Sequence, residues 1–225
     1  MISALFLFFF FLSPSVSFSN DRVHIKTADD WTIAAIHHAP KRGGRVAVLI
    51  HGAQAGKEEW ESFAAQLWSR GWGTLALDLR GHGESARPGR DFHWLDQSDA
   101  WPSAAADIEA ASRWLAKRGV PPSRQAFIGA SIGANLAALA AAKSKPAALV
   151  LLSPGLDYRG VVLKLPPKIP TLAAASPQDA YATQAARAAS QANVPSLQAR
   201  AGHGVQMFSD PEFQKAALDW LDATR

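Results

Sequence analysis

The sequence predicts an α/β protein with a mostly parallel central sheet, helices on both faces and an antiparallel hairpin at one edge. Two observations predict this class. From residue 45 to the end, short apolar runs alternate with segments whose apolar residues recur at helical spacing, which is typical of parallel sheets covered by helices. The short runs also lack polar alternation, as expected of strands buried on both faces.

The expected elements follow one another without a linker or an internal repeat. Two β-patterned runs joined by Asp29-Asp30 form the hairpin at the start. The expected strands are 22–27, 31–38, 45–50, 73–79, 125–129, 147–153, 170–176 and 196–202. The expected helices are 57–70, 103–117, 132–142, an Ala-rich segment after 176, and 210–223. The longest irregular stretches are 80–100 and 154–169.

Composition limits the classes of function. The 225 residues suit one domain, residues 20–225, behind a short leader. The net charge is +4, but Lys and Arg are scattered, so we expect no nucleic-acid partner. The absence of cysteine excludes disulfides, thiolate nucleophiles and Cys-based zinc sites. No His, Asp or Glu cluster has metal-ligand spacing, so we expect neither a metal nor a cofactor.

Residues 1–19 have the pattern of a signal peptide. An apolar stretch from Ala4 to Leu12 precedes a Pro/Ser-rich region with small-x-small sites for cleavage. The stretch is too short to span a bilayer, and no Lys or Arg precedes it. We expect a periplasmic or secreted protein without stable membrane insertion once the leader is removed. Cytoplasmic residence is the alternative, and the sequence does not predict the oligomeric state.

Polar residues follow the expected strands. In a sheet of this kind, ligands gather at the carboxyl ends of the strands. The segment Gly129-Ala130-Ser131-Ile132-Gly133 follows the strand at 125–129. Asp157 follows the strand at 147–153, Asp179 the strand at 170–176, and His203 the strand at 196–202. A hydroxyl, two candidate acids and a histidine are therefore expected on one edge of the sheet.

These residue types can perform nucleophilic catalysis. Gly129 and Gly133 lack a Cβ, so strand and helix can approach closely around an elbow that exposes Ser131. A serine needs a base beside it, and histidine is the side chain that titrates nearest to neutral pH. His203 is therefore the expected base. A carboxylate must hold its tautomer; we expect Asp179, with Asp157 as the alternative.

Four motifs in order resemble the α/β-hydrolase superfamily: HGA at 51–53, DLRGHGES at 78–85, GASIGA at 129–134 and AGHG at 201–204. The resemblance covers nearly everything after the leader. It implies an oxyanion hole made by the backbone N–H groups of Ala53 and Ile132. Residues 154–169 are too few for a helical lid, so the chain resembles small lidless members similar to dienelactone hydrolases and esterases. Residues 86–102 are the one other candidate cover.

The resemblance implies a serine hydrolase that cleaves a small-molecule carboxylic ester through an acyl-enzyme. Thioesters, lactones and perhydrolysis with hydrogen peroxide are alternatives on the same residues. A non-catalytic binding protein on the same scaffold is a further alternative, although no member of the triad is missing. Trp94 and Trp101 lie in an irregular stretch and are candidates for the lining of a substrate pocket.

Overall fold

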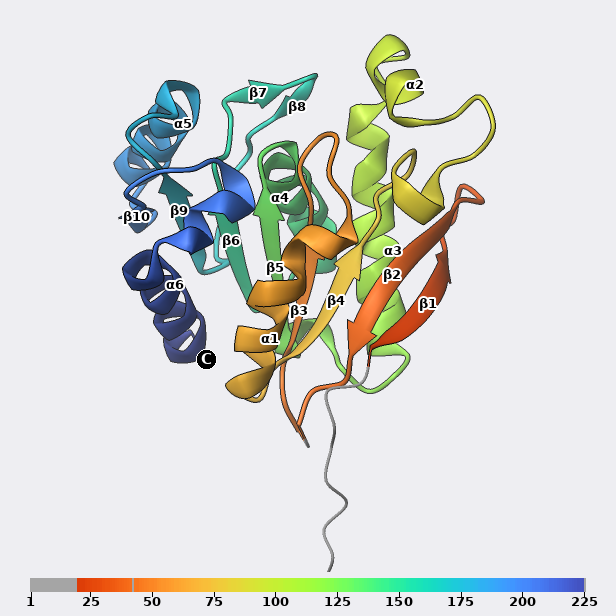
Figure 1. Ribbon diagram of the computed structural model, residues 1–225, viewed down its shortest axis with the longest axis horizontal. Helices are drawn as coiled ribbons and strands as arrows, with labels where there is room; N and C mark the ends of the chain where they lie inside the picture. Colours follow the sequence, from red (N-terminus) through yellow and green to blue (C-terminus); the bar gives the residue numbers. More distant parts are fainter. Residues whose placement is uncertain (1–19, 42, 225) are drawn as a thin grey trace, which may run out of the picture.

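The computed structural model describes residues 20–41 and 43–224 as three layers, a sheet between two sets of helices (Figure 1). The expected leader, residues 1–19, lies outside the described residues. The main sheet has the strand order β1-β2-β4-β3-β5-β6-β9-β10. β2 runs antiparallel to both of its neighbours, and the remaining pairs are parallel. The predicted fold class, including the antiparallel strands at one edge, is confirmed.

The strands of the main sheet are β1 Asp21–Lys26, β2 Thr32–His38, β3 Val46–Ile50, β4 Gly73–Leu77, β5 Gln125–Ala130, β6 Ala148–Leu152, β9 Thr171–Ala175 and β10 Ser196–Gln198. The α-helices are α1 Glu61–Ser69, α2 Phe92–Gln97, α3 Ala105–Ala116, α4 Ile132–Ser144, α5 Ala180–Gln191 and α6 Pro211–Ala223. Short 3₁₀ turns are η1 Lys57–Trp60, η2 Gly83–Ser85, η3 Trp101–Ala104, η4 Pro122–Arg124 and η5 Gly204–Ser209.

The continuous apolar strands are buried because both faces of the sheet are covered. Along β3, Val48 and Ile50 pack in the core beneath α3 and α4, whereas Ala47 and Leu49 pack on the opposite side with α1 and α6. α5 joins α3 and α4 on their face through alanines of α5 and β9. Successive side chains of a strand point to opposite faces, so a strand between two helical layers needs apolar residues at every position.

The helix α4 is packed largely through alanine. Its buried alanines are Ala134, Ala137, Ala138, Ala140 and Ala141, each at most 1 % exposed, and Ile132, Asn135 and Leu136 are buried with them. They contact β5, β6 and α3. Small side chains allow the helix axis to lie close to the sheet, and this is the helix that begins immediately after Ser131.

Two short segments lie above the carboxyl ends of the parallel strands (Figure 1). One is α2, and the other is a hairpin of β7 Asp157–Tyr158 and β8 Val161–Val162. Both fall in stretches that the sequence left irregular. Neither is large enough to form a lid domain, in agreement with the prediction. The expected helices at 57–70 and 103–117 are shortened by initial 3₁₀ turns, and the expected strand at 196–202 ends at Gln198.

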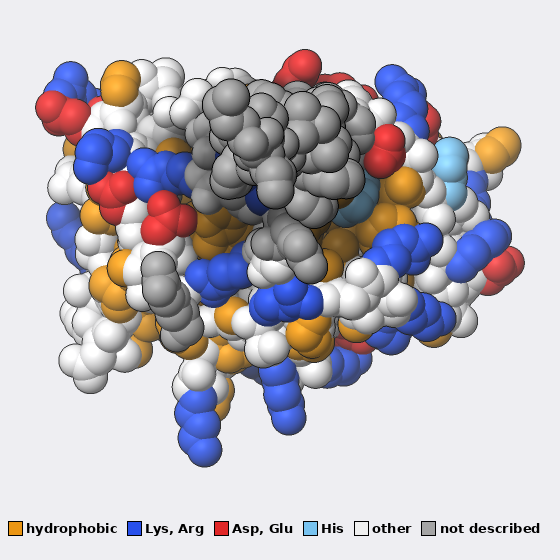
Figure 2. Space-filling model, turned by 90° about the horizontal axis from the view of Figure 1, so that it is seen from below, with side chains coloured by type: hydrophobic (Ala, Val, Ile, Leu, Met, Phe, Trp, Pro, Cys, Tyr) orange, Lys and Arg blue, Asp and Glu red, His pale blue; other side chains and the backbone are white. Residues whose placement is uncertain are grey.

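The end of the molecule that faces away from these segments is seen in Figure 2. Lys and Arg side chains are spread over this face, among apolar and neutral groups, with fewer acidic side chains between them. Within residues 20–41 and 43–224, no helix combines the length and the apolar character that a membrane span requires.

Candidate active site

Ser131 occupies a strained turn between β5 and α4. Its backbone has φ 56° and ψ −128°, although it carries a side chain. Positive φ is uncommon outside glycine, and such a conformation costs about 1–3 kcal/mol. The Ser131 N–H donates to the carbonyl of Leu152 in the neighbouring strand β6 at 2.8 Å. The surrounding fold therefore holds this residue in a conformation that a free chain avoids.

The two flanking glycines are required by close backbone approach. A Cβ on Gly129 would lie 2.7 Å from the Cα of Ala134, and a Cβ on Gly133 would lie 2.6 Å from the carbonyl oxygen of Ile50. Carbon atoms pack best at about 3.5–4.0 Å, so contacts below about 3 Å are strongly repulsive. Only glycine at both positions lets α4 start this close to β5 and to the end of β3.

The loop after β3 runs directly beside the nucleophile candidate. A Cβ on Gly52 would lie 3.1 Å from the Cβ of Ser131. Ala53 follows in the same loop, and Ile132 is the first residue of α4. The first N–H groups of a helix have no intrahelical acceptor, and the helix end carries partial positive charge. The expected oxyanion donors therefore belong to two segments that the structure places next to Ser131.

His51 fixes the shape of the loop that follows β3. Its ring is fully buried, with Nδ1 2.6 Å from the carbonyl oxygen of Gly52 and Nε2 3.0 Å from the backbone nitrogen of Leu79. The Leu79 N–H donates to Nε2, so the proton of the neutral ring is on Nδ1 and is donated to Gly52. Burial lowers the pKa of His51 to about 3, and the nearby ring of His82 acts in the same direction. This histidine is neutral at physiological pH.

Asp179, the expected acid, contacts His203, the expected base. Asp179 Oδ2 lies 2.5 Å from His203 Nδ1. Asp179 is also the N-cap of α5, where Oδ1 accepts from the Ala182 N–H at 3.1 Å. A carboxylate only accepts hydrogen bonds, so Nδ1 of His203 donates. The side chain of His203 is 45 % exposed, and its other ring nitrogen can act as a base.

The His203 loop packs on the elbow. A Cβ on Gly204 would lie 3.1 Å from the Cβ of Ala130 and 4.0 Å from the nitrogen of Ser131. The Gly204 N–H donates to Ser153 Oγ at 2.9 Å, and Ser176 Oγ donates to the Gly202 carbonyl at 2.6 Å. Within the described chain, no hydrogen bond joins Ser131 to His203. Such bonds are often long without substrate and tighten when it binds.

The alternative acid, Asp157, is engaged elsewhere. Its Oδ1 accepts from the Gly160 N–H at 2.8 Å within the β7–β8 turn. Its backbone N–H donates to Tyr181 Oη, and Tyr181 Oη donates to its carbonyl at 2.7 Å. The carboxylate serves as a turn residue, and the structure brings Asp179 rather than Asp157 to His203.

The two tryptophans in the irregular stretch differ. Trp101 is fully buried, and its Nε1 donates to Asp96 Oδ1 at 2.7 Å. Its ring therefore offers no surface to a ligand, which corrects the expectation that it lines a pocket; its packing against His82 and Phe92 explains the burial. Trp94 is half-buried, with its ring 5.9 Å from that of Trp31.

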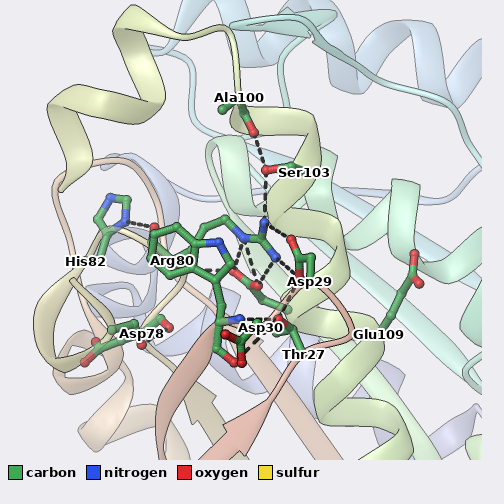
Figure 3. A network of polar contacts seen from close by, with 12 residues as sticks. Thr27, Asp29, Asp30, Asp78, Arg80, His82, Ala100, Ser103 and Glu109 are labelled. Atoms are coloured by element: carbon green, nitrogen blue, oxygen red, sulfur yellow. Dashed lines mark hydrogen bonds and ion pairs between the residues drawn. The ribbon is translucent and has the colours of Figure 1, made fainter. Parts of the chain in front are cut away.

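The loop after β4 is fixed by buried ion pairs. Arg80 is 1 % exposed, and it donates to Asp107 through its backbone N–H, Nε and a terminal nitrogen. Its other terminal nitrogen reaches Asp29 at 2.6 Å and Ser103 at 3.2 Å (Figure 3). The single guanidinium thus joins the β1–β2 turn, the loop after β4 and the start of α3.

Asp78 ties the same loop to η1. It accepts from Lys57 Nζ at 2.7 Å, from the Lys57 N–H at 2.9 Å and from the Glu84 N–H at 3.0 Å. Burial alone would raise the pKa of Asp78, but these hydrogen bonds lower it below its ordinary value. The buried Lys57 is a residue that sequence reasoning placed only as part of a helix.

Sequence reasoning also missed two polar residues in the segments around the elbow. Asn135 is fully buried in the first turns of α4. Tyr158 lies on β7, and its hydroxyl donates to the Ser153 carbonyl at 3.4 Å. Asn135 carried a signal, because it is the polar residue within a long apolar run of small side chains. Tyr158 carried none, since its position depends on a hairpin that only the tertiary structure defines.

The buried His51 should make stability fall in mild acid. Below the ordinary histidine pKa of 6.5, the unfolded chain takes up a proton that the folded His51 refuses until about pH 3. The stabilisation is complete above pH 6.5 and is lost as the pH falls, by about 2 kcal/mol at pH 5. We expect urea unfolding of the full chain and of His51→Gln at pH 7.5 and 5 to differ in this pH dependence.

Comparing the full chain with His51→Gln isolates the contribution of His51 to the pH dependence of stability. His37 and His82 act with the same sign, since burial lowers the pKa of both. Glu59 and Asp107 act with the opposite sign, since desolvation raises the pKa of Glu59 to about 7 and that of Asp107 to about 6. The Glu59 side chain keeps much of its contact with solvent, so its effect on stability is small. All four remain in the variant. His51→Gln should be less stable at pH 7.5 but lose about 2 kcal/mol less on acidification. Equal losses in the two proteins would contradict the assignment.

No group of three or more His, Asp or Glu side chains suited to a metal ion occurs among the residues that the structure describes.

Comparisons with known proteins agree with the architecture. Residues 42–218 match the family Hydrolase_4, described as serine aminopeptidase, S33. An uncharacterized protein of Mycobacterium tuberculosis strain H37Rv is 34 % identical over 135 residues, which are 59 % of this chain and 44 % of that relative. The chain thus spans less than half the length of this curated relative.

Two solved structures share the fold over nearly their whole length. An esterase of Pyrococcus furiosus superposes with a TM-score of 0.72 at 17 % identity, covering 99 % of this chain and 97 % of that one. A dienelactone hydrolase of Anabaena variabilis gives 0.66 at 17 % identity, covering 92 % and 96 %. At this identity the likeness concerns the fold alone. With the family match over most of the sequence, this protein belongs to the serine aminopeptidase S33 family of α/β-hydrolases.

Proposed function

We propose that this protein is a serine hydrolase that cleaves carboxylic esters, with Ser131 as nucleophile, His203 as base and Asp179 as acid. One observation carries the proposal. Ser131 is held at positive φ in a tight turn, and the loop that packs on this turn bears a histidine 2.5 Å from a carboxylate. A strained serine beside an oriented histidine is the arrangement that acyl transfer needs.

The reaction proceeds in two steps of acyl transfer. His203 removes the proton of Ser131 as its oxygen attacks the ester carbonyl, and Asp179 stabilises the imidazolium through Nδ1. His203 then gives that proton to the leaving alcohol, which leaves an acyl-enzyme. Water attacks the acyl-enzyme with the same base, and the Ser131 hydroxyl is restored. Charge on the carbonyl oxygen is stabilised by the N–H groups of Ala53 and Ile132.

Esters suit this site better than amides. The side chain of His203 is 45 % exposed. The segments α2 and the β7–β8 hairpin, which lie above the strand ends, are both short. An open site excludes little water and holds the substrate through few contacts. Amide cleavage has the higher barrier and depends more on such positioning. An ester has a better leaving group than an amide, so its cleavage depends less on positioning and on the exclusion of water.

A substrate panel tests the proposal. The full chain would be assayed with p-nitrophenyl esters from acetate to dodecanoate, an acyl thioester, a lactone and an aminoacyl p-nitroanilide, and for peracid formation from acetate and peroxide. We expect kcat/KM on at least one ester to exceed that on the p-nitroanilide by more than about 100-fold, since the carboxylic ester is the proposed substrate. The chain-length profile then reports the depth of the acyl subsite.

Each other result would replace the proposal with a different one. Turnover confined to the thioester, the lactone or the peroxide reaction would keep the triad and change the substrate class. Preference for the p-nitroanilide would indicate a peptidase. A folded protein that is inert on all substrates would remove the ester-hydrolase proposal.

A further inference from the structure

Two short segments, α2 and the β7–β8 hairpin, flank the strand ends that carry the proposed catalytic groups. In the main sheet, β3 and β5 lie between β4 and β6. α2 belongs to the connection after β4, and the hairpin belongs to the connection after β6. The loop with Ala53 follows β3, and Ser131 follows β5. Figure 1 shows the hairpin pointing toward α2. A link between the two segments therefore crosses from one side of β3 and β5 to the other.

A charged side chain at the tip of the hairpin makes this link. Arg159, in the turn of the hairpin, forms an ion pair with Asp96 of α2. Its guanidinium carbon lies 6.0 Å from the ring centroids of both Phe92 and Trp101, at the outer limit of cation–π attraction. Asp96 is itself held in place, because Trp101 Nε1 donates to its Oδ1 at 2.7 Å. The tip of the hairpin is thus joined to α2.

The base of the hairpin is fixed to the nucleophile helix. Asn135 of α4 donates to the carbonyls of Gly155 at 2.9 Å and Val161 at 2.7 Å, and it accepts from the Gly155 N–H at 3.1 Å. A fully buried amide that lost these partners would be costly, so the three hydrogen bonds are maintained. Both ends of the hairpin are therefore held by the helix that begins after Ser131.

α2 is connected to the loop after β3 through two stacked histidines. The ring of His82 lies 5.5 Å from the rings of both Phe92 and Trp101, and 4.7 Å from the ring of His51. His51 donates in turn to the Gly52 carbonyl. The contacts thus run from the loop after β3 to α2, across the Arg159–Asp96 ion pair to the hairpin, and back to α4.

The two faces of the sheet indicate which part of an ester meets this chain of contacts. Phe92 and Val161 pack with the core beneath α3 and α4. The turn η5, which follows His203, packs with the core of the opposite face through Met207 and Phe208. His203 has to protonate the leaving alcohol, so the alcohol lies on its side. The acyl group of the ester then points toward α2 and the hairpin.

We propose that the Arg159–Asp96 ion pair determines acyl specificity, because it holds the hairpin against α2 and limits the space on the acyl side of Ser131. The inference rests on the proposed ester hydrolysis. It names short acyl groups, such as acetyl and butyryl, as the preferred class. The side chains of Arg159 and Asp96 are 45 % and 27 % exposed, so the link opens at a modest cost and longer chains are disfavoured without being excluded.

Two substitutions remove the ion pair and keep the other contacts of each residue. Arg159→Asn deletes the guanidinium, and asparagine tolerates the φ of 54° at this position. Asp96→Asn deletes the carboxylate charge, and its amide oxygen can still accept from Trp101 Nε1. We expect wild type to prefer p-nitrophenyl acetate to the octanoate. Each variant should raise the ratio of kcat/KM for octanoate to that for acetate by about fivefold, as for loss of a partly exposed ion pair.

A double variant and a distant ion pair supply the controls. Arg159→Asn combined with Asp96→Asn should shift the ratio no further than either single change, because all three variants lose the same interaction. Lys215→Gln removes an exposed ion pair of α6, in which Lys215 Nζ lies 2.6 Å from Asp219 Oδ2. Its ratio should stay within about twofold of wild type, as surface changes usually do.

Amide hydrogen exchange measures the link without any substrate. Exchange over residues 92–97 and 157–162 should be faster in Arg159→Asn and in Asp96→Asn than in wild type, and unchanged in Lys215→Gln. Exchange equal to wild type in both variants would show that the pair does not hold the two segments together.

The activity data separate the inference from the proposed function. An unchanged ratio in both single variants, or a wild type that prefers the octanoate, overturns the inference and leaves ester hydrolysis standing. An equal loss on all esters also overturns it, since general damage to the site would explain that result. Shifts that add in the double variant would indicate two independent effects and not one ion pair. If wild type hydrolyses no ester, the proposed function fails first, and acyl specificity fails with it.

Discussion

Ser131→Ala is expected to lower kcat for ester hydrolysis by about 10⁶-fold, to the level that binding and the oxyanion donors alone provide. The change removes the attacking oxygen and leaves the Cβ in place. The backbone at Ser131 keeps its positive φ, so the elbow and α4 should be undisturbed. The measurement is initial rate with the best ester of the panel, together with labelling by a fluorophosphonate and mass analysis of the modified peptide.

A matched serine provides the control. Ser69 is exposed at the end of α1, where its hydroxyl donates to the Gln66 carbonyl at 2.7 Å. Ser69→Ala should hydrolyse esters at the wild-type rate and should still be labelled. Retention of more than about 1 % of activity by Ser131→Ala, with the protein folded, contradicts a covalent role for Ser131, because a lost nucleophile leaves far less.

Asp179→Asn is expected to lower kcat by about 10⁴-fold. The Asp179 carboxylate accepts the Nδ1 proton of His203, which leaves Nε2 free to take the proton of Ser131. An asparagine can turn its amide N–H₂ toward the ring, and Nδ1 then has to accept. The proton moves to Nε2, and the histidine becomes the wrong tautomer to act as a base. Initial rates with the best ester measure the loss.

Two controls separate the catalytic role of Asp179 from a structural one: the stability of Asp179→Asn and the activity of Asp157→Asn. Asp179 also caps α5, and asparagine is as good an N-cap as aspartate, so the urea midpoint of Asp179→Asn should remain close to that of wild type. Asp157→Asn changes a carboxylate that bonds only Gly160 within its turn. It should keep activity within about threefold, as surface changes usually do. A large loss in Asp157→Asn with none in Asp179→Asn would assign the acid to Asp157 instead.

The sequence was sufficient for the features that local chemistry determines. Strands such as 46–50 are continuously apolar because helices cover both faces, and this pattern is visible in the residues themselves. The glycines at 129 and 133 predicted an elbow because no residue with a Cβ fits there. The order of polar residues at the strand ends placed Ser131, Asp179 and His203 on one edge, and the strand order of the sheet agrees.

The parts that could not be predicted depend on contacts between distant segments. The β7–β8 hairpin has two residues in each strand, too few for a recognisable alternation, and it is held by Asn135 and by the Arg159–Asp96 ion pair. The six-residue helix α2 is equally short. Trp101 was a pocket candidate because it lies in a stretch without a regular pattern, yet its neighbours in space are His82 and Phe92. Proximity of this kind is absent from the local pattern.

The alanine surface of α4 has a consequence for thermal motion at the nucleophile. Alanine has no χ angle, so the alanine contacts of α4 have no alternative rotamers among which they could fluctuate, and only a few buried side chains of the helix, such as Leu136, have any. Ser131 is joined to the sheet on one side by β5 and on the other by a helix seated on Cβ atoms and backbone. Its mean-square displacement should therefore follow vibrations of the whole sheet more than local repacking. The nucleophile would keep its position because few side chains beneath it can change rotamer.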